Sequence, residues 1–277
     1  MAKLVTIFGT LLVVAGAATS TPRASEASER ALRQAMGYSQ RGMHSLEKGN
    51  AARAAEDFRR ALEQIPNLPD AHAGLGHVAM QQHRFEDALV EYRRAQEAYS
   101  SFAAQRVDLA QARFSRNKDE IQRLTDEKSA LDREQMRVQV QGGSLTTGSA
   151  ASEGRLQRDR TMYEQSIARL ESQTQQVPAL EADASDPPAA YYFYEANALF
   201  NLKKNDDAIV AWERAVAKDP RYGVAYNNLA VAYWMTGRLD AAQTSLSKAE
   251  SLGFKVNPSF RADLQKSVAQ KRGAAAN

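Results

Sequence analysis

The chain lacks cysteine altogether and has few histidines among its 277 residues. Without cysteine it can form no disulfide, carry no lipid behind an export signal and use no thiolate as a nucleophile or metal ligand. The histidines are His44, His72, His77 and His83. His72 and His77 stand five residues apart, the wrong spacing for two ligands on one helix face, and no HExxH motif occurs. The sequence therefore predicts no metal site.

Motifs for nucleotides and nucleic acids are absent as well. No glycine-rich phosphate-binding loop is present. The 36 lysines and arginines are nearly balanced by 33 aspartates and glutamates, which leaves a net charge of +3. No basic run with interleaved aromatic residues forms the stripe that nucleic acids need. We therefore expect no catalytic residues, no cofactor and no nucleic-acid partner, and a protein that is not an enzyme.

The N-terminus has the pattern of a secretory signal. Lys3 precedes an apolar run over residues 4–18, which is short for a membrane span, and small residues from Ala15 to Ala18 offer cleavage sites. The pattern predicts a cleaved signal peptide over 1–20, a polar tether over 21–34 and a periplasmic or secreted protein. Two alternatives stay open: residues 4–18 could remain as a membrane anchor, the sole contact with a membrane, or the segment could be a mitochondrial presequence.

A 34-residue period is the clearest positive feature of the chain. Within residues 35–102, Ala54 recurs as Ala88 and Phe58 recurs as Tyr92. The spacing Ala-x3-aromatic-x2-Ala puts all three side chains on one helix face, because helix neighbours lie three and four residues apart. A period of this length indicates stacked helix–turn–helix units.

The same period returns over residues 189–256. There Ala208 recurs as Ala242 at the same offset. Pro66 and Pro220 each follow a predicted second helix and should end it, since proline cannot continue a helix.

These units resemble tetratricopeptide repeats. The second unit has the family's residues at Leu75, Gly76, Ala88, Tyr92 and Ala95. The family's closing proline is replaced there by serine, and the first unit has arginine for leucine. The resemblance implies a helical solenoid that serves as a binding scaffold for protein partners, with repeats 1–2 over 35–102 and repeats 3–4 over 189–256.

The segment between the two pairs of repeats departs from this register. Heptad seams run from Val107 to Val138 and from Leu156 to Val177, and a Gly/Ser-rich stretch joins them. The pattern predicts a long antiparallel coiled-coil hairpin over 103–177, followed by a linker over 178–188. The alternative is two amphipathic helices lying flat on the solenoid.

The outer parts of this arrangement can be predicted too. The first seam is longer than the second, so we expect residues 103–118 to form the first helix of an expanded third unit. Residues 257–277 contain an amphipathic helix with Phe260, Leu264 and Val268 on one face, and solenoids need such a terminal cap. The predicted fold class is all-α, a tetratricopeptide-type solenoid interrupted by a coiled-coil hairpin.

A protein-binding groove is expected on the concave side, where the first helices of the units lie. Apolar walls with a few polar groups suit a partner helix or an extended peptide. Alternatively, these side chains contact the neighbouring helix or the chain's own terminal segment. The candidate groove residues are Phe193, Asn197, Phe200, Asn201, Asn227, Val231, Trp234 and Met235 in repeats 3–4, and Met36, Met43, Leu46, Ala73, His77 and Met80 in repeats 1–2.

Within this groove, Phe200 and Trp234 are the expected anchors for a partner. The resemblance also suggests a clamp that would bind the C-terminal carboxylate of a partner peptide, because Asn197 and Asn228 match the asparagine positions of such a clamp. Phe193 occupies the position of its lysine, which disfavours that clamp.

Two function classes follow. The first is an exported scaffold or adaptor that contacts a protein partner through its groove and its coiled-coil arm. The alternative is a structural or assembly subunit of a larger envelope or membrane-associated complex, in which the arm pairs with a second copy of the chain.

Overall fold

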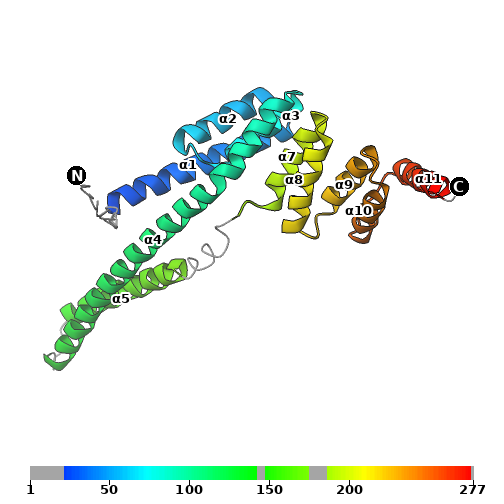
Figure 1. Cartoon of the computed structure of the whole chain (residues 1–277). Helices are drawn as coiled ribbons and strands as arrows, with labels where there is room; N and C mark the ends of the chain where they lie inside the picture. The colour runs from blue at the N-terminus through cyan, green and yellow to red at the C-terminus, as the bar shows by residue number, and fades with distance from the viewer. Residues whose placement is uncertain (1–21, 142–146, 175–185, 276–277) are drawn as a thin grey trace, which may run out of the picture.

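The chain forms a row of antiparallel helix pairs from which a long two-helix arm projects (Figure 1). The computed structural model describes residues 22–141, 147–174 and 186–275, and the predicted signal peptide lies outside them. Among these residues no helix is both long and apolar enough to cross a membrane. The described helices are α1 (Pro22–Glu47), α2 (Ala51–Gln64), α3 (Pro69–Gln81), α4 (Phe85–Gln141), α5 (Thr147–Thr174), α7 (Ala189–Asn201), α8 (Asn205–Lys218), α9 (Gly223–Met235), α10 (Leu239–Ser251) and α11 (Pro258–Ala275).

The helix ends follow local sequence signals. Asn50 precedes α2, and its side chain accepts a hydrogen bond from the backbone N–H of Arg53 at 3.1 Å, as a helix-capping asparagine does. α2 ends before Pro66 and α8 ends before Pro220, as the two prolines predict. The repeat units are therefore α1–α2, α3 with the first part of α4, α7–α8 and α9–α10.

Small residues let these helices approach closely. Phe58 is fully buried between two glycines of the first helices. A Cβ atom added to Gly42 would lie 2.7 Å from the Phe58 ring, and one added to Gly74 would lie 2.3 Å from it. The ring thus fills the space that the absent side chains leave.

The turn after each first helix repeats as well. Its final residue has a positive φ at Gly49, His83, Lys203 and Gly237, with φ values of 77°, 56°, 63° and 75°. Within each pair of repeats these positions are 34 residues apart. Glycine adopts this left-handed conformation without steric cost, whereas the Cβ atoms of His83 and Lys203 make it unfavourable in the other two turns.

The inserted segment does not begin with a helix of its own. α4 continues the second helix of repeat two without a break to Gln141, over 57 residues, or about 85 Å. The expectation that residues 103–118 form the first helix of an expanded third unit is therefore wrong. The physical reason is that residues 85–141 contain neither proline nor glycine to end the helix.

α5 runs antiparallel beside the outer part of α4 and completes the arm. Lys128 Nζ lies 3.3 Å from Glu164, and Arg160 lies 3.7 Å from Asp132. This register places Thr174 level with Lys118. α4 and α5 thus form an antiparallel helical hairpin as predicted, and it projects away from the solenoid instead of lying on it (Figure 1). Coiled-coil packing between the two helices stays a prediction.

The root of the arm is fixed by α1. Buried Glu29 lies between Arg113 at 2.9 Å and Arg116 at 3.0 Å on α4. Burial raises the pKa of Glu29, but hydrogen bonds and charges of the two arginines lower it more, so the carboxylate stays ionised. The first half of α1, predicted as a tether, is thus helical from Pro22 and packs on α4.

The solenoid continues across the insert. Glu195 of α7 accepts hydrogen bonds from Arg93 at 2.9 Å and Gln96 at 2.8 Å, both on α4. The Tyr191 hydroxyl of α7 donates to Asp70 of α3 at 2.8 Å. Repeat three therefore stacks directly on repeat two.

Candidate protein-binding cleft

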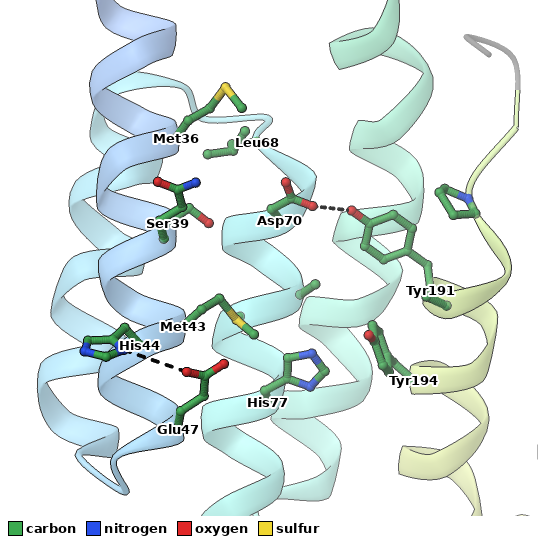
Figure 2. A pocket seen from close by; sticks show the side chains of 15 residues that line it. Met36, Ser39, Met43, His44, Glu47, Leu68, Asp70, His77, Tyr191 and Tyr194 are labelled. Atoms are coloured by element: carbon green, nitrogen blue, oxygen red, sulfur yellow. Dashed lines mark hydrogen bonds and ion pairs between the residues drawn. The ribbon is translucent and has the colours of Figure 1, made fainter. Parts of the chain in front are cut away.

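A cleft that we call the main cleft lies on the concave side, between the first helices of three successive repeats. Its volume is about 560 Å³. Figure 2 shows side chains of α1, α3 and α7 facing the same space. The lining residues are Met36, Ser39, Gln40, Met43, His44, Glu47, Leu68, Asp70, Ala73, Gly74, His77, Pro188, Ala190, Tyr191 and Tyr194.

Methionine and tyrosine side chains form opposite walls of the cleft. Met36 and Met43 stand on one face of α1 and are 48% and 38% exposed, although both are large and apolar. Tyr191 and Tyr194 face them from α7. Between the two walls lies Ala73 of α3, whose small side chain leaves space in the cleft. Such surfaces suit a binding groove, because thioethers adapt to partners of different shape.

Two carboxylates lie along the cleft. Asp70 accepts the hydrogen bond from Tyr191, and burial followed by the Asp70 charge raises the pKa of Tyr191, which therefore stays a donor. Glu47 is the last residue of α1, and its carboxylate lies 3.8 Å from Nδ1 of His44. The cleft thus combines apolar contact with negative charge.

His77 forms part of the floor. Its Nδ1 lies 2.9 Å from the Tyr92 hydroxyl, and its ring meets the Tyr194 ring edge-on at 4.4 Å. Burial lowers the pKa of His77 and raises that of Tyr92, so both groups are neutral near pH 7. His77 therefore adds no positive charge to the cleft.

A second, smaller cleft of about 320 Å³ lies further along the concave side. The Asn201 side chain donates to the backbone carbonyl of Asn197 at 2.8 Å, and Asn228 donates to the side chain of Asn197 at 3.2 Å. Phe200 packs against Trp212 with ring centroids 5.5 Å apart. This cleft contains the predicted residues Met80, Asn197, Phe200, Asn201 and Val231.

The other predicted residues of repeats 3–4 lie outside both clefts. The Trp234 ring packs against Phe260 of α11 at 5.7 Å, and its Nε1 donates to Ser267 at 3.1 Å. Phe193 packs against Tyr222 at 5.0 Å. The structure therefore places Trp234 against the terminal helix, which is the alternative left open by the sequence. Asn227 and Met235 likewise line neither of the two clefts.

Sequence reasoning predicted four of the residues that line the main cleft, Met36, Met43, Ala73 and His77, and missed the others, among them both carboxylates and both tyrosines. Glu47 stands one helical turn after Met43 on α1, so extending the series of Met36 and Met43 by one turn would have predicted it. Asp70, Tyr191 and Tyr194 were not foreseeable, because they join the cleft only when α7 stacks beside α3 across the insert. No cluster of three or more metal-binding side chains occurs in the part of the chain that the structure describes.

Stacked helix pairs with a concave cleft define a helical repeat scaffold, and family comparisons specify its type. Models described as tetratricopeptide repeat match residues 45–114 and 224–252, and a model described as TPR repeat matches residues 196–237. These matches fall on both sides of the arm. The chain is a tetratricopeptide repeat protein, and its repeats form a scaffold for protein–protein interaction.

Weak similarities to solved structures include two proteins that are described as TPR proteins. A thermophilic TPR protein of Thermus thermophilus is 15% identical, with a TM-score of 0.34 over 87% of this chain and 99% of that one. PilF of Pseudomonas aeruginosa is 17% identical, with a TM-score of 0.35 over 90% and 89%. YrrB, described as a TPR protein with an unusual peptide-binding site, is 16% identical, with a TM-score of 0.26 over 87% and 99%. TM-scores of this size carry no inference about function. Curated proteins give no significant sequence match.

Proposed function

We propose that the protein is an exported adaptor that holds a segment of a protein partner in the cleft between α1, α3 and α7. The observation that carries the proposal is the exposure of Met36 and Met43 on the wall of a concave cleft of about 560 Å³. The repeat packing does not use these side chains. Large apolar groups left at the surface of a concavity are characteristic of binding sites.

The smaller cleft extends this contact surface. Phe200 and Val231 supply apolar walls there, and Asn197, Asn201 and Asn228 supply amide groups that can hydrogen-bond a peptide backbone. An extended partner segment that fills the main cleft would continue past Met80 into this second cleft.

Export and the role of the arm belong to the same proposal. Export is supported by the charged start, the apolar run and the small residues within 1–20. The arm supplies a second contact, since Met136 and Met162 on it are 67% and 65% exposed. If those methionines instead pair two copies of the chain, the protein is an assembly subunit, which its mass in solution would reveal.

Photo-crosslinking from inside the cleft tests the proposal. A photoreactive phenylalanine analogue replaces Met43 in the full-length chain, expressed in its native host. We expect irradiation to join the protein to a specific partner, because the side chain at position 43 lies on the cleft wall.

The matched control carries the same analogue at Val210 on α8, which is 48% exposed and lies outside both clefts. It should give no such product. Equal products from both positions, or none from position 43, would contradict the proposal.

A further inference from the structure

The charge of the main cleft differs from that of the chain as a whole. The chain has more basic than acidic residues, yet the side chains that line this cleft include Asp70 and Glu47 and no lysine or arginine. In the described ranges neither carboxylate forms an ion pair with a lysine or arginine, and Glu47 has only His44 beside it. Its side chain is 72% exposed.

The position of Glu47 is unfavourable for the helix that carries it. A carboxylate at the C-terminal end of a helix meets the negative end of the helix dipole. Asp70 lies in the first turn of α3, where the dipole favours a carboxylate. Helix stability therefore accounts for the charge of Asp70 but not for that of Glu47.

A neighbouring cleft has the opposite character. It lies between α1 and α2 and is lined by Arg41, Lys48 and Arg53 together with Asp57. An acidic segment would be attracted to that side of α1. The concave cleft instead offers carboxylates next to methionine and tyrosine side chains.

We propose that the occupant of the concave cleft is a partner segment in which lysine or arginine side chains alternate with apolar ones. This inference rests on the proposed function and specifies its partner. The alkyl stem of a lysine or arginine packs on thioethers and aromatic rings while its head reaches a carboxylate. Asp70 and Glu47 come from different helices of the cleft, so a segment lying across α1 and α3 can pair with both.

Two synthetic peptides test this inference by isothermal titration calorimetry on the full-length chain. They share one leucine and alanine pattern of about 15 residues with blocked ends, and one has lysine where the other has glutamate. We expect the lysine peptide to bind at least about tenfold more tightly, and its affinity to fall as salt rises from about 20 to about 200 mM.

Single substitutions identify the carboxylates responsible. Glu47→Gln and Asp70→Asn should each weaken the lysine peptide about threefold to tenfold. Glu47→Gln should leave the melting temperature unchanged or raised, because it removes the unfavourable charge at the end of α1. Glu63→Gln removes an exposed carboxylate from the last turn of α2, outside the cleft, and is the matched control: it should leave the affinity for the lysine peptide unchanged.

The outcomes separate the inference from the proposed function. Equal binding of both peptides, preference for the glutamate peptide, binding of neither, or unchanged affinity in Glu47→Gln overturns the inference. If crosslinking from position 43 still captures a partner, the proposed function stands and its partner has a different chemistry. If that crosslink also fails, both are overturned.

Discussion

At the scale of a single residue, we expect His77 in the cleft floor to make the stability of the folded protein depend on pH. Its imidazole packs between the Tyr92 hydroxyl and the Tyr194 ring, and burial lowers its pKa below the ordinary value of 6.5. The unfolded chain therefore binds a proton at a higher pH than the folded chain does. Acidification should favour unfolding as the pH falls from about 6.5 toward the folded pKa.

We predict that His77→Gln reduces the loss of stability between about pH 7.5 and pH 5.5. The effect of one histidine cannot exceed about 1.4 kcal/mol per pH unit, and partial exposure makes it smaller. Urea unfolding of both proteins at the two pH values measures it. The other histidines are common to both proteins and cancel in the comparison. An identical loss in wild type and variant would show that His77 titrates normally.

Trp234 illustrates why single residues of the candidate site were hard to assign from sequence. Its position on the first helix of repeat four made it a candidate for the groove. Whether a partner or the chain's own α11 covers it depends on how residues 258–275 dock, and no pattern near Trp234 specifies that. Phe200, with no terminal helix over it, lines a cleft.

At the scale of an element, the turns after the first helices differ in one testable way. Lys203 and Gly237 occupy equivalent positions with φ near 63° and 75°. A side chain in this left-handed region costs about 1 kcal/mol. The two residues are therefore a natural pair for exchange.

We predict that Lys203→Gly stabilises the protein by roughly 0.5–1 kcal/mol, and that Gly237→Lys destabilises it by about as much. Chemical denaturation of each variant and of the double exchange measures both effects. The double exchange should be close to wild type, because the sites lie in separate turns. Destabilisation by Lys203→Gly would show that the lysine side chain stabilises its turn more than its backbone strains it.

The elements themselves were largely predictable. The alanine and aromatic spacing located the repeat helices, and the heptad seams located both arms of the hairpin. The continuity of α4 could also have been predicted, because residues 85–141 contain no proline or glycine that would end a helix. The 34-residue period instead suggested that a helix ends near residue 102. The contacts of Glu29 with Arg113 and Arg116 could not be read, because they join segments more than 80 residues apart.

At the scale of the whole molecule, the arm beyond its root should be dispensable for folding. α5 forms ion pairs with the outer part of α4, whereas the root of the arm, as far as Arg116, contacts α1. From Tyr99, which contacts Tyr191, to residue 118 the helix rises about 29 Å. Residues 178–188 can span about 36 Å when extended, so the chain can return without the outer arm.

We predict that replacing residues 119–177 with a short Gly/Ser linker leaves a folded protein with one cooperative unfolding transition. Circular dichroism during heating measures this, and sedimentation measures its mass. Wild type and variant should both be monomeric if the protein is an adaptor. An oligomer that becomes monomeric on deletion would favour the assembly subunit.

The control deletion removes 103–177 and with it the α4 surface that holds the first half of α1. This protein should unfold at a lower temperature. If the shorter deletion is insoluble or unfolded, the outer arm is part of the core and the two-part description is wrong.

Because α4 continues from repeat two into the arm without a break, its length determines how far the arm extends from the repeats. One continuous helix thus belongs both to the stack of repeats and to the arm. Adding seven residues to each arm would lengthen the reach by about 10.5 Å and leave every repeat contact unchanged. The reach of the arm can therefore be altered without changing any residue of the cleft.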